Sequence, residues 1–143
     1  DASWSRGLGD VYKRQVMYGV AAVLKTMREQ KSGHIINLSS VAGHVVFPGA
    51  TVYCATKFAV KAISEGIRKE SNGEIRATNI SPGAVATELT DHISHKDSKQ
   101  MADDMYDDAI DADAIARAIT FAIEQPGDVD INEMVIRPTS QEL

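Results

Sequence analysis

The chain has 143 residues, a formal net charge of −5 and 43% hydrophobic residues. These values fit a single globular domain, or part of one, and exclude wholesale disorder. The negative net charge gives no indication of a basic surface that would bind nucleic acid. No apolar run approaches the roughly 20 residues of a membrane span. The single cysteine, Cys54, cannot form an internal disulfide. We therefore expect a cytoplasmic protein that binds neither nucleic acid nor membrane.

The first 15 residues differ from the rest of the chain in their pattern of apolar residues. Up to Asp10 they show neither helical nor strand periodicity. The run SRGLGDVYKRQ within them resembles a translated sequencing-adapter read, so we interpret residues 1–15 as a foreign or disordered leader. The pair Gly7 and Gly9 does not indicate a dinucleotide-binding loop, because no strand precedes it and the third glycine of that motif is missing.

The remaining residues, 16–143, alternate between helical and strand patterns. Helices are expected over residues 16–30, 52–70 and 112–124, and strands over residues 34–38, 75–80 and 131–136. Gly33 is expected to cap the first helix, Pro82 to lie beyond the second strand, and Asp111 to cap the third helix. This alternation predicts an α/β fold with a parallel sheet and helices on both faces.

The segment between the second strand and the third helix, residues 87–113, is polar and strongly acidic, and we expect it to be solvated and mobile. Its two histidines, His92 and His95, are three residues apart, but no third ligand accompanies them, so we predict surface residues and no metal site. Cys54 is interpreted as a packing residue. Asn37, inside a strand, is expected to make a structural hydrogen bond.

The stretch that organises the chain combines a hydroxyl at Ser40, a phenol at Tyr53 and an ammonium at Lys57. Residues four apart on a helix share one face, so Tyr53 and Lys57 are expected to border one cleft. A cation favours the phenolate and lowers a phenol pKa from its reference of about 10. A phenol tuned in this way can donate and accept a proton at neutral pH. The spacing therefore predicts a catalytic acid-base pair.

Residues 16–143 resemble the C-terminal half of a classical short-chain dehydrogenase/reductase. The resemblance rests on three motifs, namely Ile36-Asn37-Leu38-Ser39-Ser40, Tyr53-Cys54-Ala55-Thr56-Lys57 and Pro82-Gly83-Ala84-Val85-Ala86-Thr87. It implies the last three strands, with their helices, of a Rossmann-like doubly wound parallel sheet. It also implies an oxidoreductase that transfers a hydride between NAD or NADP and a secondary alcohol or ketone.

The resemblance also assigns roles to individual residues. Tyr53 is expected to be the general acid-base, Lys57 to assist it and to hold the nicotinamide ribose, and Ser40 to bind the substrate oxygen. The residues expected to fix the nicotinamide ring are Pro82, Gly83, Val85 through its backbone, and Thr87. The acidic segment that follows matches the variable substrate lid of the family.

The chain also departs from the family pattern. The glycine-rich strand-turn-helix that holds the pyrophosphate is not in these 143 residues, and the position of a fourth catalytic residue, an asparagine, falls at about Tyr12. We therefore expect a truncated, inactive form of a small-molecule enzyme that is a homodimer or homotetramer at full length. The alternative is a non-catalytic fragment that retains only the oligomerisation surface of the family.

Overall fold

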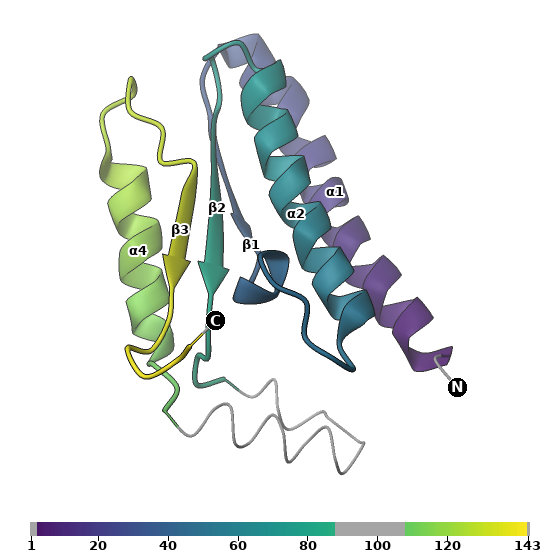
Figure 1. The fold of residues 1–143 in the computed structure, drawn as a ribbon. Helices are drawn as coiled ribbons and strands as arrows, with labels where there is room; N and C mark the ends of the chain where they lie inside the picture. The colour runs from purple at the N-terminus through teal and green to yellow at the C-terminus, as the bar shows by residue number, and fades with distance from the viewer. Residues whose placement is uncertain (1–2, 88–107, 143) are drawn as a thin grey trace.

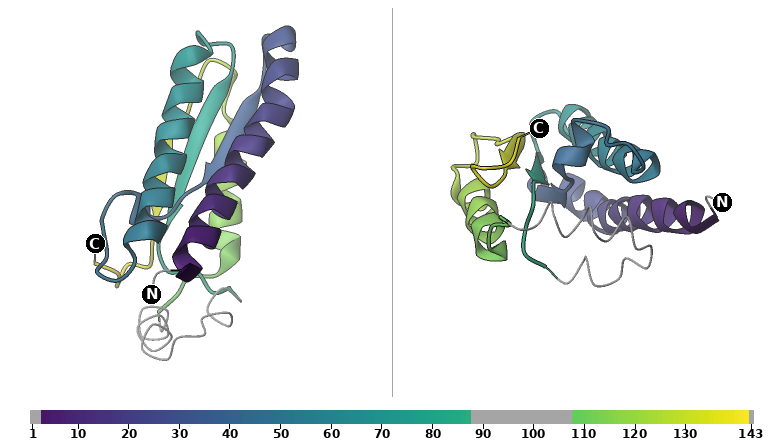
Figure 2. Two further views of the ribbon diagram at one scale, coloured as in Figure 1. Left: turned by 90° about the vertical axis from the view of Figure 1, so that its right-hand side faces the viewer. Right: turned by 60° about the horizontal axis from the view of Figure 1, so that its bottom comes forward.

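Three parallel strands and three long helices make up the computed structural model, which describes residues 3–87 and 108–142, with side chains from Lys13 onward. The strands β1 (His34–Leu38), β2 (Arg76–Pro82) and β3 (Glu133–Ile136) form one sheet in the order β1-β2-β3. The helices α1 (Ser3–Gln30) and α2 (Thr51–Glu70) lie side by side on one face, and α4 (Ala112–Glu124) covers the other (Figures 1 and 2). The expected Rossmann-like α/β arrangement is confirmed.

The sheet is held in register by apolar residues that face the helices. On the side of α1 and α2, Ile35 of β1 lies opposite Ala77 of β2, and both are buried. On the other side, Ile80 of β2 lies opposite Met134 of β3. A core cluster fills the space between the sheet and the helices α1 and α2; its buried members are Ile35, Ile67, Ile75 and Ala77, with Val20, Leu24, Met27 and Ile63 packed around them. A one-residue slip would turn these strand residues to the wrong face, so burial fixes the register.

The helix α1 differs from the sequence prediction at both of its ends. It begins at Ser3, so the expected start at Val16 is wrong; extending an existing helix adds one hydrogen bond per residue and needs no new nucleus. At its other end Lys31 takes the left-handed backbone conformation, and the amide of Ser32 donates to the Met27 carbonyl at 3.1 Å. This is a Schellman cap, and Gly33 is not the capping residue. Whether residues 1–15 are foreign or native stays a prediction.

Gly33 is required for a different reason. A Cβ at this position would lie 2.6 Å from Cγ of Met27, so only a residue without a side chain allows the Met27 side chain to pack there.

The strand β2 extends to Pro82, two residues beyond the end expected at Ile80. The Asn79 amide donates to the Asn132 carbonyl, just before β3, at 3.0 Å, and the Gly83 amide donates to the Ile136 carbonyl of β3 at 2.7 Å. Because backbone groups alternate sides along a strand, those of position 82 point toward β1. The strand β1 has ended by then, because Leu38 already pairs with Ile80. The last bond between the two segments runs from the Ser39 amide to the Ile80 carbonyl at 2.7 Å. Proline lacks only the N–H group that would extend this pairing, so it is tolerated at the end of the central strand.

Both ends of α4 are fixed by side chains. Asp111 caps the first turn as predicted, with its carboxylate accepting from the Asp113 amide at 2.8 Å. At the other end the Arg76 guanidinium, from β2, donates to carbonyls of α4 and the turn after it at 3.2 to 3.4 Å. A cation at a helix C-terminus also complements the helix dipole, so Arg76 joins α4 to the sheet.

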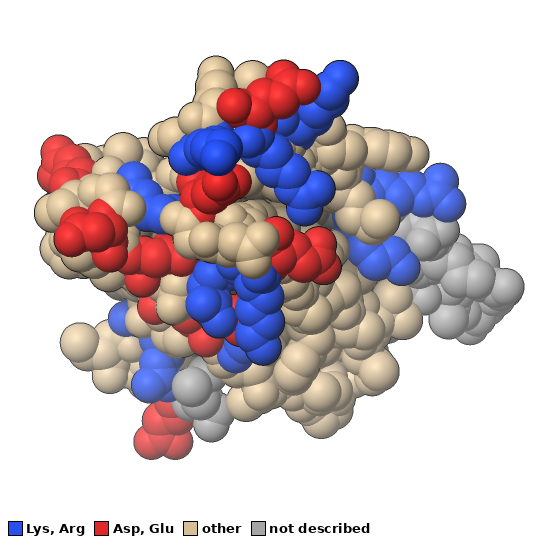
Figure 3. Space-filling view, turned by 90° about the horizontal axis from the view of Figure 1, so that it is seen from above, with Lys and Arg blue, Asp and Glu red and all other residues tan. Residues whose placement is uncertain are grey.

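The end of the molecule where the strands begin carries charges of both signs, and blue and red side chains alternate across it in Figure 3. Ion pairs near the last turns of α1 and α2 join Arg28 to Glu70 and Lys31 to Glu74. None of the helices in the described ranges is long and apolar enough to cross a membrane. The expected surface histidines, His92 and His95, lie outside the described residues, as does most of the acidic segment.

Candidate active site

The strand β1 delivers Ser40 to the carboxyl edge of the sheet. Ser40 has an extended backbone and caps a short 3-10 helix, η1 (Val41–Gly43), with its Oγ accepting from the Ala42 amide at 3.1 Å. Because that bond uses only a lone pair of the oxygen, the Ser40 hydroxyl can still donate its own proton. The cap therefore fixes the side chain and preserves its donor.

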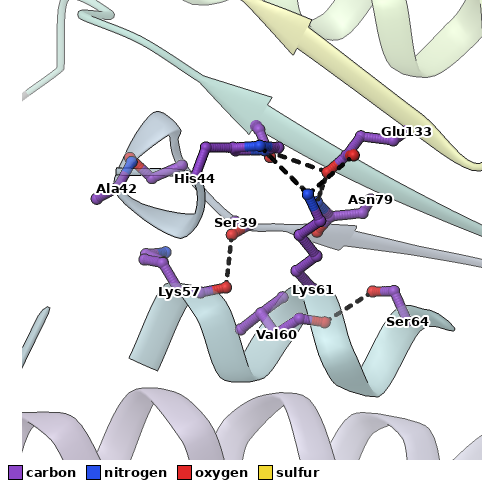
Figure 4. A network of polar contacts seen from close by, with 11 residues as sticks. Ser39, Ala42, His44, Lys57, Val60, Lys61, Ser64, Asn79 and Glu133 are labelled. Atoms are coloured by element: carbon purple, nitrogen blue, oxygen red, sulfur yellow. Dashed lines mark hydrogen bonds and ion pairs between the residues drawn. The ribbon is translucent and has the colours of Figure 1, made fainter. Parts of the chain in front are cut away.

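The turn of η1 is packed directly on the helix turn that carries Lys57. The Ser39 hydroxyl donates to the Lys57 carbonyl at 2.9 Å, as Figure 4 shows. Gly43 lies so close to the same carbonyl that a Cβ would come within 3.0 Å of its oxygen. The position of Ser40 is therefore coupled to the position of α2.

Tyr53 and Lys57 occupy the first two turns of α2, as their spacing predicted. The Lys57 Nζ lies 5.6 Å from the centroid of the Tyr53 ring, which is within the range of a cation-π contact. The same nitrogen lies 3.5 Å from the Leu38 carbonyl oxygen at the end of β1. Tyr53 is 39% exposed, so its phenol is accessible beside a cation. The two side chains expected to share one cleft are thus brought together.

Burial lowers the pKa of the Lys57 ammonium below its ordinary value of 10.5. We expect NMR titration of ¹³C-methylated lysines to give a lower pKa for Lys57 in the folded chain than in the unfolded chain. Because the folded state then binds fewer protons, this group should make the free energy of unfolding rise with pH between the lowered pKa and 10.5. A folded-state pKa at or above the unfolded one would contradict the burial of this charge.

A second loop reaches the same edge of the sheet after β2. Pro82 ends the strand, and Val85 then forms an isolated parallel bridge with Ile110. Ile110 donates to the Ala84 carbonyl at 3.1 Å and accepts from the Ala86 amide at 2.9 Å. Both hydrogen bonds of the bridge thus go to the neighbours of Val85, so the N–H and C=O of Val85 itself point away from Ile110. Thr87 is exposed at the end of the described segment.

A polar network beside this edge was not predicted from the sequence. Glu133 of β3 accepts from His44 Nε2 at 3.1 Å, from Lys61 at 3.2 Å and from the Asn79 amide group at 3.0 Å. The Lys61 ammonium also donates to His44 Nδ1 at 3.2 Å. Figure 4 shows these side chains converging from η1, α2, β2 and β3.

The network fixes the orientation of the His44 ring and the position of η1. Because an ammonium can only donate, His44 Nδ1 accepts from Lys61, and Nε2 faces Glu133. Residues from distant parts of the chain thereby hold the turn that follows Ser40. No local spacing in the sequence could have identified this set.

Two other sequence predictions concern buried residues near the site. The amide group of Asn37 donates to the Ser64 hydroxyl at 2.9 Å, so its expected structural hydrogen bond is confirmed. Cys54 is fully buried in α2, in agreement with a packing residue. Nε2 of His34 lies 2.7 Å from the Thr78 hydroxyl. In the described part of the chain no cluster of three or more His, Cys, Asp or Glu could hold a metal.

The described residues fit one end of a nicotinamide nucleotide. Two features face the carboxyl edge of the sheet, where parallel sheets bind ligands: a partly buried cation at Lys57 and the outward-turned backbone of Val85. A ribose hydroxyl and a carboxamide are the groups that such a cation and such a backbone can hold. The fit concerns the nicotinamide and its ribose, since the 143 residues contain no glycine-rich turn for the pyrophosphate.

Sequence comparison assigns the chain to a family. The profile described as short chain dehydrogenase matches residues 10–98, more than half of the chain. The chain belongs to this oxidoreductase family. The match includes Ser40, Tyr53 and Lys57, and its first residue lies within the stretch interpreted above as a leader. The resemblance inferred from the three motifs is therefore confirmed.

Individual relatives of this short-chain dehydrogenase agree with the family assignment. An uncharacterized oxidoreductase of Staphylococcus saprophyticus is 61% identical over 137 residues, which are 94% of this chain and 56% of the relative. A serine dehydrogenase complexed with NADP+ is 32% identical, with a TM-score of 0.80 over 90% of this chain and 53% of that protein. A 4-hydroxyisoleucine dehydrogenase complexed with NADH is 26% identical, with a TM-score of 0.76 over 99% of this chain and 62% of that protein. The chain thus spans about half the length of the relatives it matches.

Proposed function

We propose that this short-chain dehydrogenase sequence carries the acid-base half of an NAD(P)-dependent oxidoreductase acting on a secondary alcohol or ketone. The observation that carries the proposal is the Lys57 ammonium beside the exposed phenol of Tyr53, at the carboxyl edge of a parallel sheet. Family relatives described as complexes with NADP+ and NADH support a nicotinamide cofactor, without favouring one form.

In the proposed reaction each side chain acts on the substrate oxygen or on the group beside it. Tyr53 gives a proton to the carbonyl oxygen during reduction, or takes the proton of the alcohol during oxidation. The charge of Lys57 favours the phenolate of Tyr53 and also attracts the ribose hydroxyls of the cofactor. Ser40 donates a hydrogen bond to the same oxygen and stabilises the charge that develops there. The nicotinamide, when bound, supplies or accepts the hydride.

The loop after β2 is proposed to hold the nicotinamide ring. Pro82 and Gly83 shape its start, the backbone of Val85 binds the carboxamide, and the Thr87 hydroxyl adds a further hydrogen bond. The N–H and C=O of Val85, both turned away from Ile110, support this role. A donor and an acceptor side by side match a primary amide, which carries both N–H donors and a carbonyl acceptor.

The proposal includes a cytoplasmic location and a homo-oligomeric full-length form. Exposed apolar side chains on α1 and α2, such as Tyr18 and Phe58, support association through these helices. The same observation supports the alternative function, a non-catalytic form that retains only an association surface. The two functions differ in whether the chain binds a nicotinamide cofactor.

Calorimetric titration of the chain with NADP+ and NAD+ distinguishes the proposed oxidoreductase function from the non-catalytic one. We expect measurable binding of at least one of them, and weaker binding by the Lys57→Met variant, because the variant loses the cation that faces the ribose. The matched control is Lys25→Met, which removes an exposed lysine whose only described partner is Glu29, one helix turn away. Absence of binding at millimolar cofactor would leave the non-catalytic function.

A further inference from the structure

The C-terminal residues 137–142 lie against the start of the proposed cofactor loop. The side-chain oxygen Oε1 of Gln141 accepts a hydrogen bond from the Ala84 amide at 2.9 Å. The preceding amide, that of Gly83, donates to the Ile136 carbonyl at 2.7 Å. Two consecutive amides of the loop are therefore bound by residues near the C-terminus.

The contact is close as well as polar. A Cβ at Gly83 would lie 2.7 Å from the Cβ of Arg137 and nearer still to Oε1 of Gln141. Real Cβ atoms do not approach neighbours so closely, so glycine at this position allows the C-terminal residues to lie against the loop. Glycine is needed at position 83 because the C-terminal residues pack so closely there. The backbone does not require it, since φ of Gly83 is not in the left-handed region.

The backbone of Gln141 is itself held in place. Its backbone amide donates to the Pro138 carbonyl at 3.1 Å, which closes a tight turn, and its carbonyl accepts from the Arg137 guanidinium at 3.2 Å. Pro138 is buried, so the turn is anchored to the body of the protein. The backbone of this turn is already ordered. Forming the hydrogen bond from Ala84 to Gln141 therefore costs little additional conformational entropy.

The geometry points to Gln141 as a positioning residue for residues 82–85, which it holds in the conformation that presents the N–H and C=O of Val85 to the nicotinamide carboxamide. This inference rests on the proposed function. Gln141 would not touch the cofactor. It would act through Ala84, whose amide lies one residue before Val85, and through the close packing on Gly83.

Three variants of the chain test the inference. Gln141→Leu removes the acceptor with little change of size, Gln141→Glu keeps an acceptor oxygen, and Ser140→Ala changes an exposed neighbour in the same turn. The first measurement is NMR amide exchange of Ala84 in the chain without cofactor. The second is the calorimetric dissociation constant for NADP+ or NAD+.

We expect Gln141→Leu to speed Ala84 exchange at least about tenfold and to weaken cofactor binding about fivefold, the effect of losing one ordinary hydrogen bond. Exchange in β1 should not change. Gln141→Glu and Ser140→Ala should keep Ala84 protected. Unchanged Ala84 exchange in Gln141→Leu, or faster exchange with unchanged cofactor affinity, would overturn the inference. If the unmodified chain binds no nicotinamide, the proposed function and the role of Gln141 toward the cofactor both fail, while the exchange data still decide whether Gln141 holds the loop.

Discussion

Tyr53→Phe is expected to lower turnover by about a thousandfold, the middle of the range for loss of a positioned general acid-base. The substitution removes a single oxygen atom and keeps the ring that lies against Lys57. Cofactor affinity should therefore stay close to that of the unmodified protein, and the loss should appear in kcat. Reduction of a ketone with NADPH or NADH, followed by absorbance, measures it.

The assay needs a form of the protein with measurable turnover. Because the chain spans 56% of its Staphylococcus saprophyticus relative, joining it to the remaining part of that relative provides a suitable fusion. Tyr18→Phe serves as the control, since Tyr18 is a highly exposed tyrosine of α1 and should tolerate the same loss of a hydroxyl. Turnover in Tyr53→Phe within a few-fold of the unmodified fusion would refute the role assigned to Tyr53.

Gly43→Ala is expected to lower the free energy of unfolding by about 2 kcal/mol, the usual cost of forcing an extra methyl group into a packed site. The added Cβ would lie 2.7 Å from the Ser39 hydroxyl and 3.0 Å from the Lys57 carbonyl oxygen. The second contact is with backbone, which cannot rotate away. The turn η1 must therefore move off α2, so turnover should fall together with stability.

Denaturation with urea measures this effect, and Gly66 offers a matched control. Gly66 lies inside α2, and a Cβ there would meet no heavy atom within 4 Å. Gly66→Ala should therefore raise the free energy of unfolding by about 0.5–1 kcal/mol, because alanine loses less conformational freedom in a helix. Equal effects of the two substitutions would show that η1 is not tightly packed on α2.

Periodicity and caps predicted most of the fold because they are local properties. The strand His34–Leu38 and the helix Ala112–Glu124, with Asp111 as its cap, occur as expected. The errors arose where local rules depend on tertiary context. Pro82 stays in the central strand because β1 has already ended beside it, and no pattern in β2 alone contains that information.

The same distinction between local and tertiary information applies to the site. Tyr53 and Lys57 could be paired from the sequence, because four residues on a helix fix a distance. Ser40 was noted with them, but only the family motif suggested its role, and the contact that fixes its side chain, with the Ala42 amide, is two residues away. Glu133 and Gln141 contact His44 and Ala84, which are far from them in the chain, so only the folded structure brings them together.

The bridge between Val85 and Ile110 has a consequence for how such a site can vary. Both of its hydrogen bonds use the backbone of Ile110 and of the neighbours of Val85. The groups through which Val85 is proposed to bind the nicotinamide are also backbone. A residue that recognises a ligand through its main chain can change its side chain without losing that recognition. Alanine scanning would therefore overlook position 85, whereas proline, which deletes the N–H, would reveal it.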